Sequence, residues 1–99
     1  MGPRIQVDRE QVAEFCRKHH IKRLALFGSV LGDEFGPDSD VDVLVEFEEG
    51  HVPGFFRLMT MQEELSGIIG RQADVRTAED LSRYFRDEVV AEAEVQYAA

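Results

Sequence analysis

Residues 26–47, LFGSVLGDEFGPDSDVDVLVEF, constrain the fold of this 99-residue chain more than any other stretch. They predict a strand that ends at Gly28-Ser29, a turn-rich segment, and a second strand that carries Asp40 and Asp42. Side chains two residues apart share a face of a strand, so the two carboxylates point the same way while the neighbouring valines face a core. Paired carboxylates resist burial, and a hard divalent cation with oxygen ligands would offset that cost.

Gly28-Ser29 predicts a place where an anion can bind. Glycine lets the backbone turn sharply and approach a ligand closely. Backbone N–H groups in such a turn, and at the start of a short helix expected at residues 30–35, form a cradle for phosphate. Either motif alone is more often an ordinary turn or an acidic strand entrance. Both together, between two apolar strands, favour a site for a nucleoside triphosphate with Mg²⁺.

The pattern Gly-Ser, ten residues, Asp-x-Asp and an apolar strand resembles the signature of the DNA polymerase β-like nucleotidyltransferase superfamily. The segments LFGS and PDSDVDVLVEF, together with the short length of the chain, resemble the minimal nucleotidyltransferases more specifically. These are small prokaryotic proteins that are usually paired with a HEPN-domain partner. The resemblance implies a small α+β (mixed α/β) fold, with a short mixed sheet of about three strands flanked by helices. It extends along the chain, so we expect one minimal nucleotidyltransferase domain over residues 1–99.

Hydrophobic spacing and turn residues give the remaining elements. A helix begins after Asp8, which Gln11 would help to cap, and a longer helix ends before Gly70. A last helix starts near residue 78, and the tail AEAEVQYAA is helix-prone, able to dock on the sheet, pack against a partner or fray. The expected strands are residues 22–27, 41–47 and 72–76, and the expected long helix is residues 55–69.

Cysteine and histidine residues suggest no chemistry of their own. Cys16 lies on the apolar face of the first helix and is interpreted as a buried thiol. His19 and His20 are interpreted as the end of that helix, because neighbouring residues of a helix point in different directions and no carboxylate or cysteine completes a ligand set. His51 is interpreted as an exposed loop residue that could reach a ligand.

Charge and composition limit the function. The formal net charge is −9, and the 11 Lys and Arg residues are scattered, so autonomous nucleic-acid binding is not expected. A basic partner, or a nucleotide that arrives with Mg²⁺, suits this charge better. The chain has no apolar run that could span a membrane and no leader-like segment, so we expect a soluble cytoplasmic protein.

The family resemblance implies specific site residues and a reaction. An acceptor hydroxyl attacks the α-phosphorus of ATP, and pyrophosphate leaves. The catalytic residues would bind two Mg²⁺ ions roughly 3.5–4 Å apart. The implied catalytic and metal-binding residues are Asp40, Asp42 and Asp74, of which Asp74 would also accept the hydroxyl proton. The implied nucleotide-binding residues are Gly28, Ser29 and Ser39, of which Ser39 would cap or steady the metal-binding loop.

Two features of the sequence shape the functional hypotheses: the missing arginines after Ser29 and the small number of residues after Asp74. Residues 30–36 lack the arginines that many relatives carry there, so Arg23, Arg57 or Arg76 would have to substitute. About 25 residues follow Asp74, too few for a substrate-binding domain, so the acceptor is expected on another protein.

By resemblance, that protein is a HEPN ribonuclease toxin, and this chain is the antitoxin that attaches AMP to one of its hydroxyl groups, expected to be a tyrosine. The first alternative is an antitoxin that masks its partner by contact, without catalysis. The second is a transferase acting on a small hydroxylated molecule such as an aminoglycoside, with a homodimer building the pocket.

Overall fold

A four-stranded mixed sheet with three α-helices forms the described part of the computed structural model, residues 5, 7–32, 35–36, 38–84 and 86–99. The strands are β1 (Ile21–Phe27), β2 (Val41–Phe47), β3 (Ala73–Arg76) and β4 (Glu94–Ala98). The α-helices are α1 (Arg9–Lys18), α2 (Phe55–Ile69) and α3 (Arg86–Glu92), and short 3₁₀ turns are η1 (Gly28–Leu31) and η2 (Ala78–Asp80). The α+β class with a small mixed sheet is confirmed.

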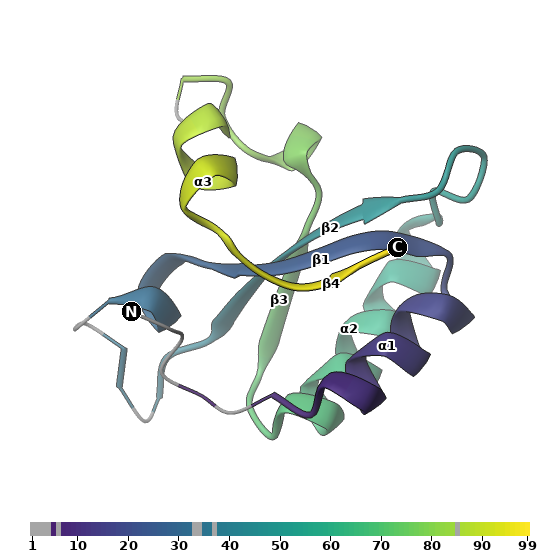
Figure 1. Cartoon of the computed structure of the whole chain (residues 1–99), viewed down its shortest axis with the longest axis horizontal. Coiled ribbons are helices and arrows are strands. Elements are labelled where there is room, and N and C mark those ends of the chain that lie inside the picture. Colours follow the sequence, from purple (N-terminus) through teal and green to yellow (C-terminus); the bar gives the residue numbers. More distant parts are fainter. Residues whose placement is uncertain (1–4, 6, 33–34, 37, 85) are drawn as a thin grey trace.

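The strand order is β3-β2-β1-β4 (Figure 1). β1 runs antiparallel to both β2 and β4, whereas β2 and β3 are parallel and are joined through α2. The fourth strand was not expected, because the tail's alanines and glutamates favour helix. In the structure the tail pairs with the otherwise open edge of β1, and Tyr97 packs against the core.

The core lies between one face of the sheet and the helices α1 and α2, while α3 lies on the other side of the sheet (Figure 1). The alternating valines of β2 face this core, as the sequence pattern predicts. Met61 and Leu65 are the buried residues of α2, and Leu58 and Ile68 pack beside them. The opposite face of the sheet is therefore left with the polar side chains of β2 and β3.

The ends of the first two helices follow their sequence signals. Asp8 Oδ1 accepts hydrogen bonds from the N–H groups of Glu10 and Gln11 at 3.0 and 3.2 Å, so it caps α1 as predicted. Gly70 ends α2 in the left-handed conformation, with φ of 79°. Cys16 is fully buried, and this burial raises the pKa of its thiol to about 12, which confirms an inert core residue.

Two expected helices were wrong in extent. The turn expected at residues 30–35 is η1, which already begins at Gly28 and ends at Leu31; residues 33–34 lie outside the described part. The last helix does not start near residue 78, because Thr77 and Asp80 close a 3₁₀ turn there through hydrogen bonds of 3.1 Å. Helix α3 starts only at Arg86, so Tyr84 is 84% exposed, and Phe85 is outside the described residues.

No helix in the described ranges is both long and apolar enough to cross a membrane.

Candidate active site

Gly28 and Asp42 meet where β1 ends beside the start of β2. Phe27 is the register partner of Asp42, and Gly28 follows with φ of +76°. A Cβ atom placed on Gly28 would overlap the carboxylate of Asp42, with Cγ at 3.2 Å. Glycine is therefore required here both by its backbone conformation and by the close approach of a carboxylate.

Asp42 and Asp74 are also register partners, across the parallel pair of β2 and β3. Both side chains are partly exposed, on the face of the sheet opposite α1 and α2. Partial burial raises the pKa of Asp42, and the negative charges of Asp74 and Asp40 raise it further, against the opposing effect of Arg76. The structure thus brings together all three predicted aspartates, with Asp40 exposed just before β2.

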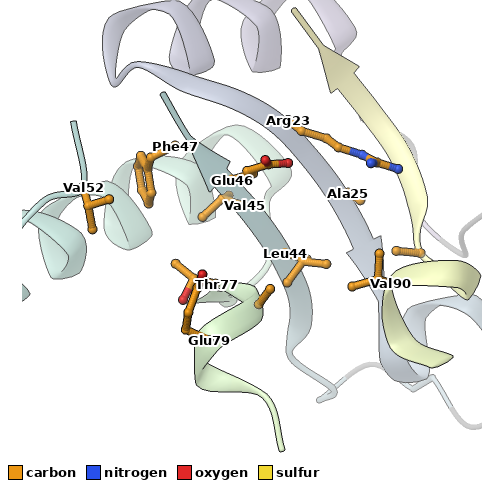
Figure 2. Close-up of a pocket in the computed structure, with 12 residues that line it drawn as sticks. Arg23, Ala25, Leu44, Val45, Glu46, Phe47, Val52, Thr77, Glu79 and Val90 are labelled. Atoms are coloured by element: carbon orange, nitrogen blue, oxygen red, sulfur yellow. The ribbon is translucent and has the colours of Figure 1, made fainter. Parts of the chain in front are cut away.

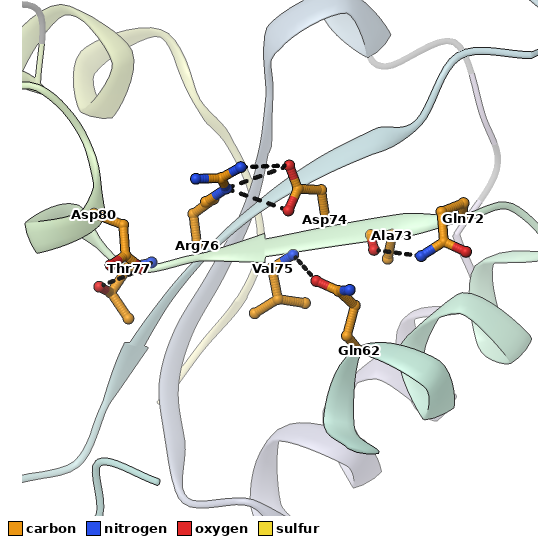
Figure 3. Close-up of polar contacts among 8 residues, drawn as sticks. All are labelled: Gln62, Gln72, Ala73, Asp74, Val75, Arg76, Thr77 and Asp80. Atoms are coloured by element: carbon orange, nitrogen blue, oxygen red, sulfur yellow. Dashed lines mark hydrogen bonds and ion pairs between the residues drawn. The ribbon is translucent and has the colours of Figure 1, made fainter. Parts of the chain in front are cut away.

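Arg76 holds Asp74 in this arrangement (Figure 3). Its Nη2 and Nε atoms donate to Asp74 Oδ2 at 3.1 and 3.3 Å, and Nε also donates to Oδ1 at 3.2 Å. These bonds raise the pKa of Arg76. Arg76 was one of three alternatives suggested to substitute for the missing phosphate-binding arginines, and in this arrangement its guanidinium binds a carboxylate. A cation shared by the aspartates would have to compete with it.

The aspartates suit a hard divalent cation. They offer carboxylate oxygens only, which Mg²⁺ prefers, and a bound cation would offset both the partial burial and the neighbouring negative charges that raise the pKa of Asp42. Within the described ranges, however, the side chains already gathered as a possible ligand set belong to His20, Glu48 and His51, at another place in the fold. The aspartates would therefore need to close around an ion, with Asp74 leaving Arg76.

Helix α2 fixes the position of β3 through two side chains. β3 is an edge strand, and its outward N–H groups would otherwise lack a strand partner. The N–H of Ala73 donates to Ser66 Oγ, and that of Val75 donates to Gln62 Oε1, both at 2.9 Å (Figure 3 shows the second bond). These bonds flank Asp74 on both sides and fix its strand against the helix.

Arg71 fixes the loop that leads to the aspartates, a role that was not predicted. Its Nη2 donates to the carbonyl oxygens of Gly36 and Ser39 at 2.6 and 2.8 Å, and its guanidinium lies 4.4 Å from the centre of the Phe35 ring. Ser39 Oγ accepts from the N–H of Gly36 at 3.0 Å, so this residue does steady the loop. The one available signal for Arg71 was its place between the helix-ending Gly70 and the strand of Asp74.

Comparison with known proteins decides the family. A family model described as a nucleotidyltransferase domain matches residues 9–96. A protein of Methanocaldococcus jannaschii named as a protein adenylyltransferase is 32% identical over 85 residues, which cover 86% of this chain and 89% of that protein. The chain belongs to the nucleotidyltransferase family.

Solved structures agree with this nucleotidyltransferase assignment. A structure named as a minimal nucleotidyltransferase superposes with a TM-score of 0.70 at 35% identity, covering 86% of this chain and 85% of that chain. A chain from the complex of a tri-AMPylated HEPN toxin of Shewanella oneidensis with an MNT antitoxin superposes with a TM-score of 0.60 at 15% identity, covering 92% of this chain and 70% of that one. The second likeness concerns the fold alone.

Two hollows of this nucleotidyltransferase include residues of β1 or of the turn that follows it. One, of about 430 Å³, includes Phe27 and Gly28 and is bounded by Val89 and Glu92 of α3. The other, of about 670 Å³, lies further along β1 and β2. Figure 2 shows the second one, in which Arg23, Ala25, Leu44 and Glu46 from the sheet face Thr77, Glu79 and Val90. The three aspartates line neither hollow.

Proposed function

We propose that this nucleotidyltransferase moves AMP from ATP to a hydroxyl group of a partner protein. The observation that carries the proposal is the position of Asp42, against the Gly28 backbone and opposite Asp74. That position supports a phosphate cradle and a carboxylate set that act together at one end of the sheet. The Methanocaldococcus jannaschii relative, named as a protein adenylyltransferase, supports AMP as the group transferred.

The residues would share the chemistry as follows. Backbone N–H groups at Gly28 and Ser29 hold the terminal phosphates, and Ser39 helps to keep the neighbouring loop in place for the nucleotide. Asp40, Asp42 and Asp74 would hold Mg²⁺, as two ions by family resemblance, and the bound metal would neutralise phosphate charge.

The acceptor oxygen then forms a bond to the α-phosphorus, and the bond from that phosphorus to pyrophosphate breaks. The hydroxyl proton passes to the Asp74 carboxylate after Arg76 has released this carboxylate. Positioning and charge account for most of the rate gain.

A HEPN toxin is the partner that the family points to, and a tyrosine is the expected acceptor. The AMPylated toxin bound to an MNT antitoxin in the Shewanella oneidensis complex supports this choice. In the present chain, Phe55 and Phe56 at the start of α2 are 69% and 85% exposed, with Val52 and Met59 beside them in sequence and also exposed. Exposed apolar side chains of this size suit contact with another protein. Both proteins would act in the cytoplasm, where ATP is available.

Transfer of label from α-labelled ATP tests the proposal. The wild-type chain, Mg²⁺ and the protein encoded beside it are incubated, and label on the partner is measured. We expect transfer by the wild type, at least a hundredfold less by Asp42→Asn, and unchanged transfer by Asp38→Asn. Asp38 is an exposed acid of the same loop, so its variant controls for the change in net charge.

A non-catalytic antitoxin is the second candidate, and the arginines favour it. Arg76 is bound to Asp74 and Arg71 to a loop, so neither is free for phosphate in this arrangement. If no label is transferred and Asp42→Asn still neutralises the toxin, this candidate replaces the first.

The third candidate is a transferase that acts on a small hydroxylated molecule, which the pocket lined by Arg23 and Glu46 could hold. A homodimer that labels such a molecule and not a protein would support it.

A further inference from the structure

His20, Glu48 and His51 gather at the opposite end of β1 and β2 from the aspartates. His20 precedes β1, Glu48 follows β2, and His51 lies in the next loop. One ligand atom from each side chain lies within 4.8 Å of the other two, and all three residues are exposed. The sequence interpretation found no carboxylate to complete a histidine ligand set, and this was wrong, because the antiparallel pairing of the strands supplies Glu48.

Backbone contacts hold the three residues together before any ligand arrives. Ile21 is the register partner of Phe47, so the next pair outward is His20 and Glu48. The N–H of Glu48 donates to the carbonyl of His20 at 2.8 Å, and the N–H of His51 donates to the carbonyl of Glu48 at 3.0 Å. His20 also adopts φ of 57°, an uncommon conformation for a residue other than glycine.

The two imidazole rings lie face to face beside this turn. The rings of His20 and His51 are stacked, with centroids 3.9 Å apart and planes inclined by 17°. Tetrahedral ligands bound at about 2.0–2.2 Å lie roughly 3.5 Å from one another, so the stacked rings would have to turn until one nitrogen of each points at a shared ion.

We propose that His20, Glu48 and His51 bind a divalent transition metal ion such as Zn²⁺. Two imidazole nitrogens and one carboxylate oxygen form a ligand set that suits zinc and its neighbours, whereas Mg²⁺ prefers oxygen ligands alone. Three protein ligands leave a coordination position for water. Seven-residue strands separate this site from the aspartates by roughly 20 Å, so it is independent of the proposed transfer reaction.

Metal bound here would join the end of α1 to the loop between β2 and α2. A ligand that binds only the folded chain stabilises it in proportion to the logarithm of its concentration over its dissociation constant. Zinc should therefore raise the melting temperature of the wild type and leave that of a His51 variant unchanged.

Titration calorimetry with Zn²⁺ alone, on the untagged full chain, tests the site. We expect one equivalent to bind, with affinity reduced at least tenfold by His51→Ala, Glu48→Gln and His20→Asn. Asparagine is chosen at position 20 because it tolerates a left-handed backbone. Glu49→Gln, the neighbouring acid, and Asp42→Asn, in the proposed magnesium site, should bind as the wild type does.

Imidazole NMR signals provide a second readout that does not depend on stability. Zinc should shift the signals of His20 and His51 and leave His19 unchanged, because His19 is buried and its Nε2 lies 3.1 Å from Glu64. Absence of binding, binding that survives His51→Ala, or binding that disappears in Asp42→Asn would overturn the proposal. None of these outcomes bears on AMP transfer.

Discussion

Asp42 lies directly opposite Asp74 across the parallel pair of β2 and β3, and each is partly exposed on the same face. Partial burial, and then repulsion by Asp74, raise the pKa of Asp42, while Arg76 partly neutralises Asp74. Such an arrangement costs stability unless a cation compensates it. We therefore interpret the pair as a site shaped for ligand binding.

Gly28→Ala should abolish nucleotide binding. Alanine at φ of +76° is strained by about 1–2 kcal/mol, and its Cβ would also displace the Asp42 carboxylate. Gly50→Ala is the matched control, since Gly50 has φ of +80° and open space around its Cβ position. Both variants should lose similar stability in urea unfolding, but only Gly28→Ala should fail to bind ATP. Equal ATP binding by the two would show that contact with Asp42 is unimportant.

Ser66→Ala should lower the free energy of unfolding by about 1–3 kcal/mol, because it leaves the N–H of Ala73 without its partner. Thr60→Ala removes a hydroxyl that bonds only within its own helix, to the Phe56 carbonyl at an exposed position, and should cost under about 0.5 kcal/mol. Urea unfolding of both variants gives the comparison. A cost for Ser66→Ala no larger than that for Thr60→Ala would mean that water replaces the bond.

Arg76→Gln should strengthen binding of Mg²⁺ in the absence of nucleotide by about twofold to fivefold. The ion pair with Asp74 is partly exposed, so its removal frees the carboxylate at a modest gain. Arg57→Gln changes the net charge equally at an exposed position of α2 and serves as the control. Weaker Mg²⁺ binding by Arg76→Gln than by Arg57→Gln would show that Arg76 supports the site and does not compete for it.

Glu64 should give a pH-dependent contribution to stability. Partial burial raises the pKa of Glu64, but hydrogen bonds from His19 and Lys18 outweigh this and lower it below its ordinary value. A lowered pKa in the folded state stabilises the protein above the unfolded-state pKa, and this stabilisation is lost as the pH falls through the folded-state pKa.

Glu64→Gln should therefore lower the melting temperature at pH 7, by an amount equivalent to about 1 kcal/mol or less, and the difference should shrink under acid conditions. Glu63→Gln controls for the loss of charge. A difference that persists unchanged in acid would place the effect in packing.

The sequence predicted the elements whose signals are local. Residues 41–47 and 55–69 were predicted with the observed bounds, because alternating valines and the helix-ending Gly70 depend on neighbours in the chain. β4 was missed because its conformation depends on the free edge of β1, which no local pattern reveals.

The same limit applies to the sites. The proximity of Gly28, Asp42 and Asp74 could be anticipated from a family pattern, but the raised pKa of Asp42 could not. Arg71 finds its partners only when the loop is assembled beside β3, whereas Arg76 lies two residues from Asp74 on the same strand. The histidine cluster depends on strand register, which joins residues 20 and 48 across the hairpin.

Binding of a non-hydrolysable ATP analogue, measured by titration calorimetry with and without Mg²⁺, tests the central claim most directly. We expect the wild type and Asp38→Asn to bind the analogue only with Mg²⁺, and Asp42→Asn and Asp74→Asn to bind at least tenfold more weakly. Equal affinity in Asp42→Asn, or binding that ignores Mg²⁺, would contradict the claim that these carboxylates form the nucleotide and metal site.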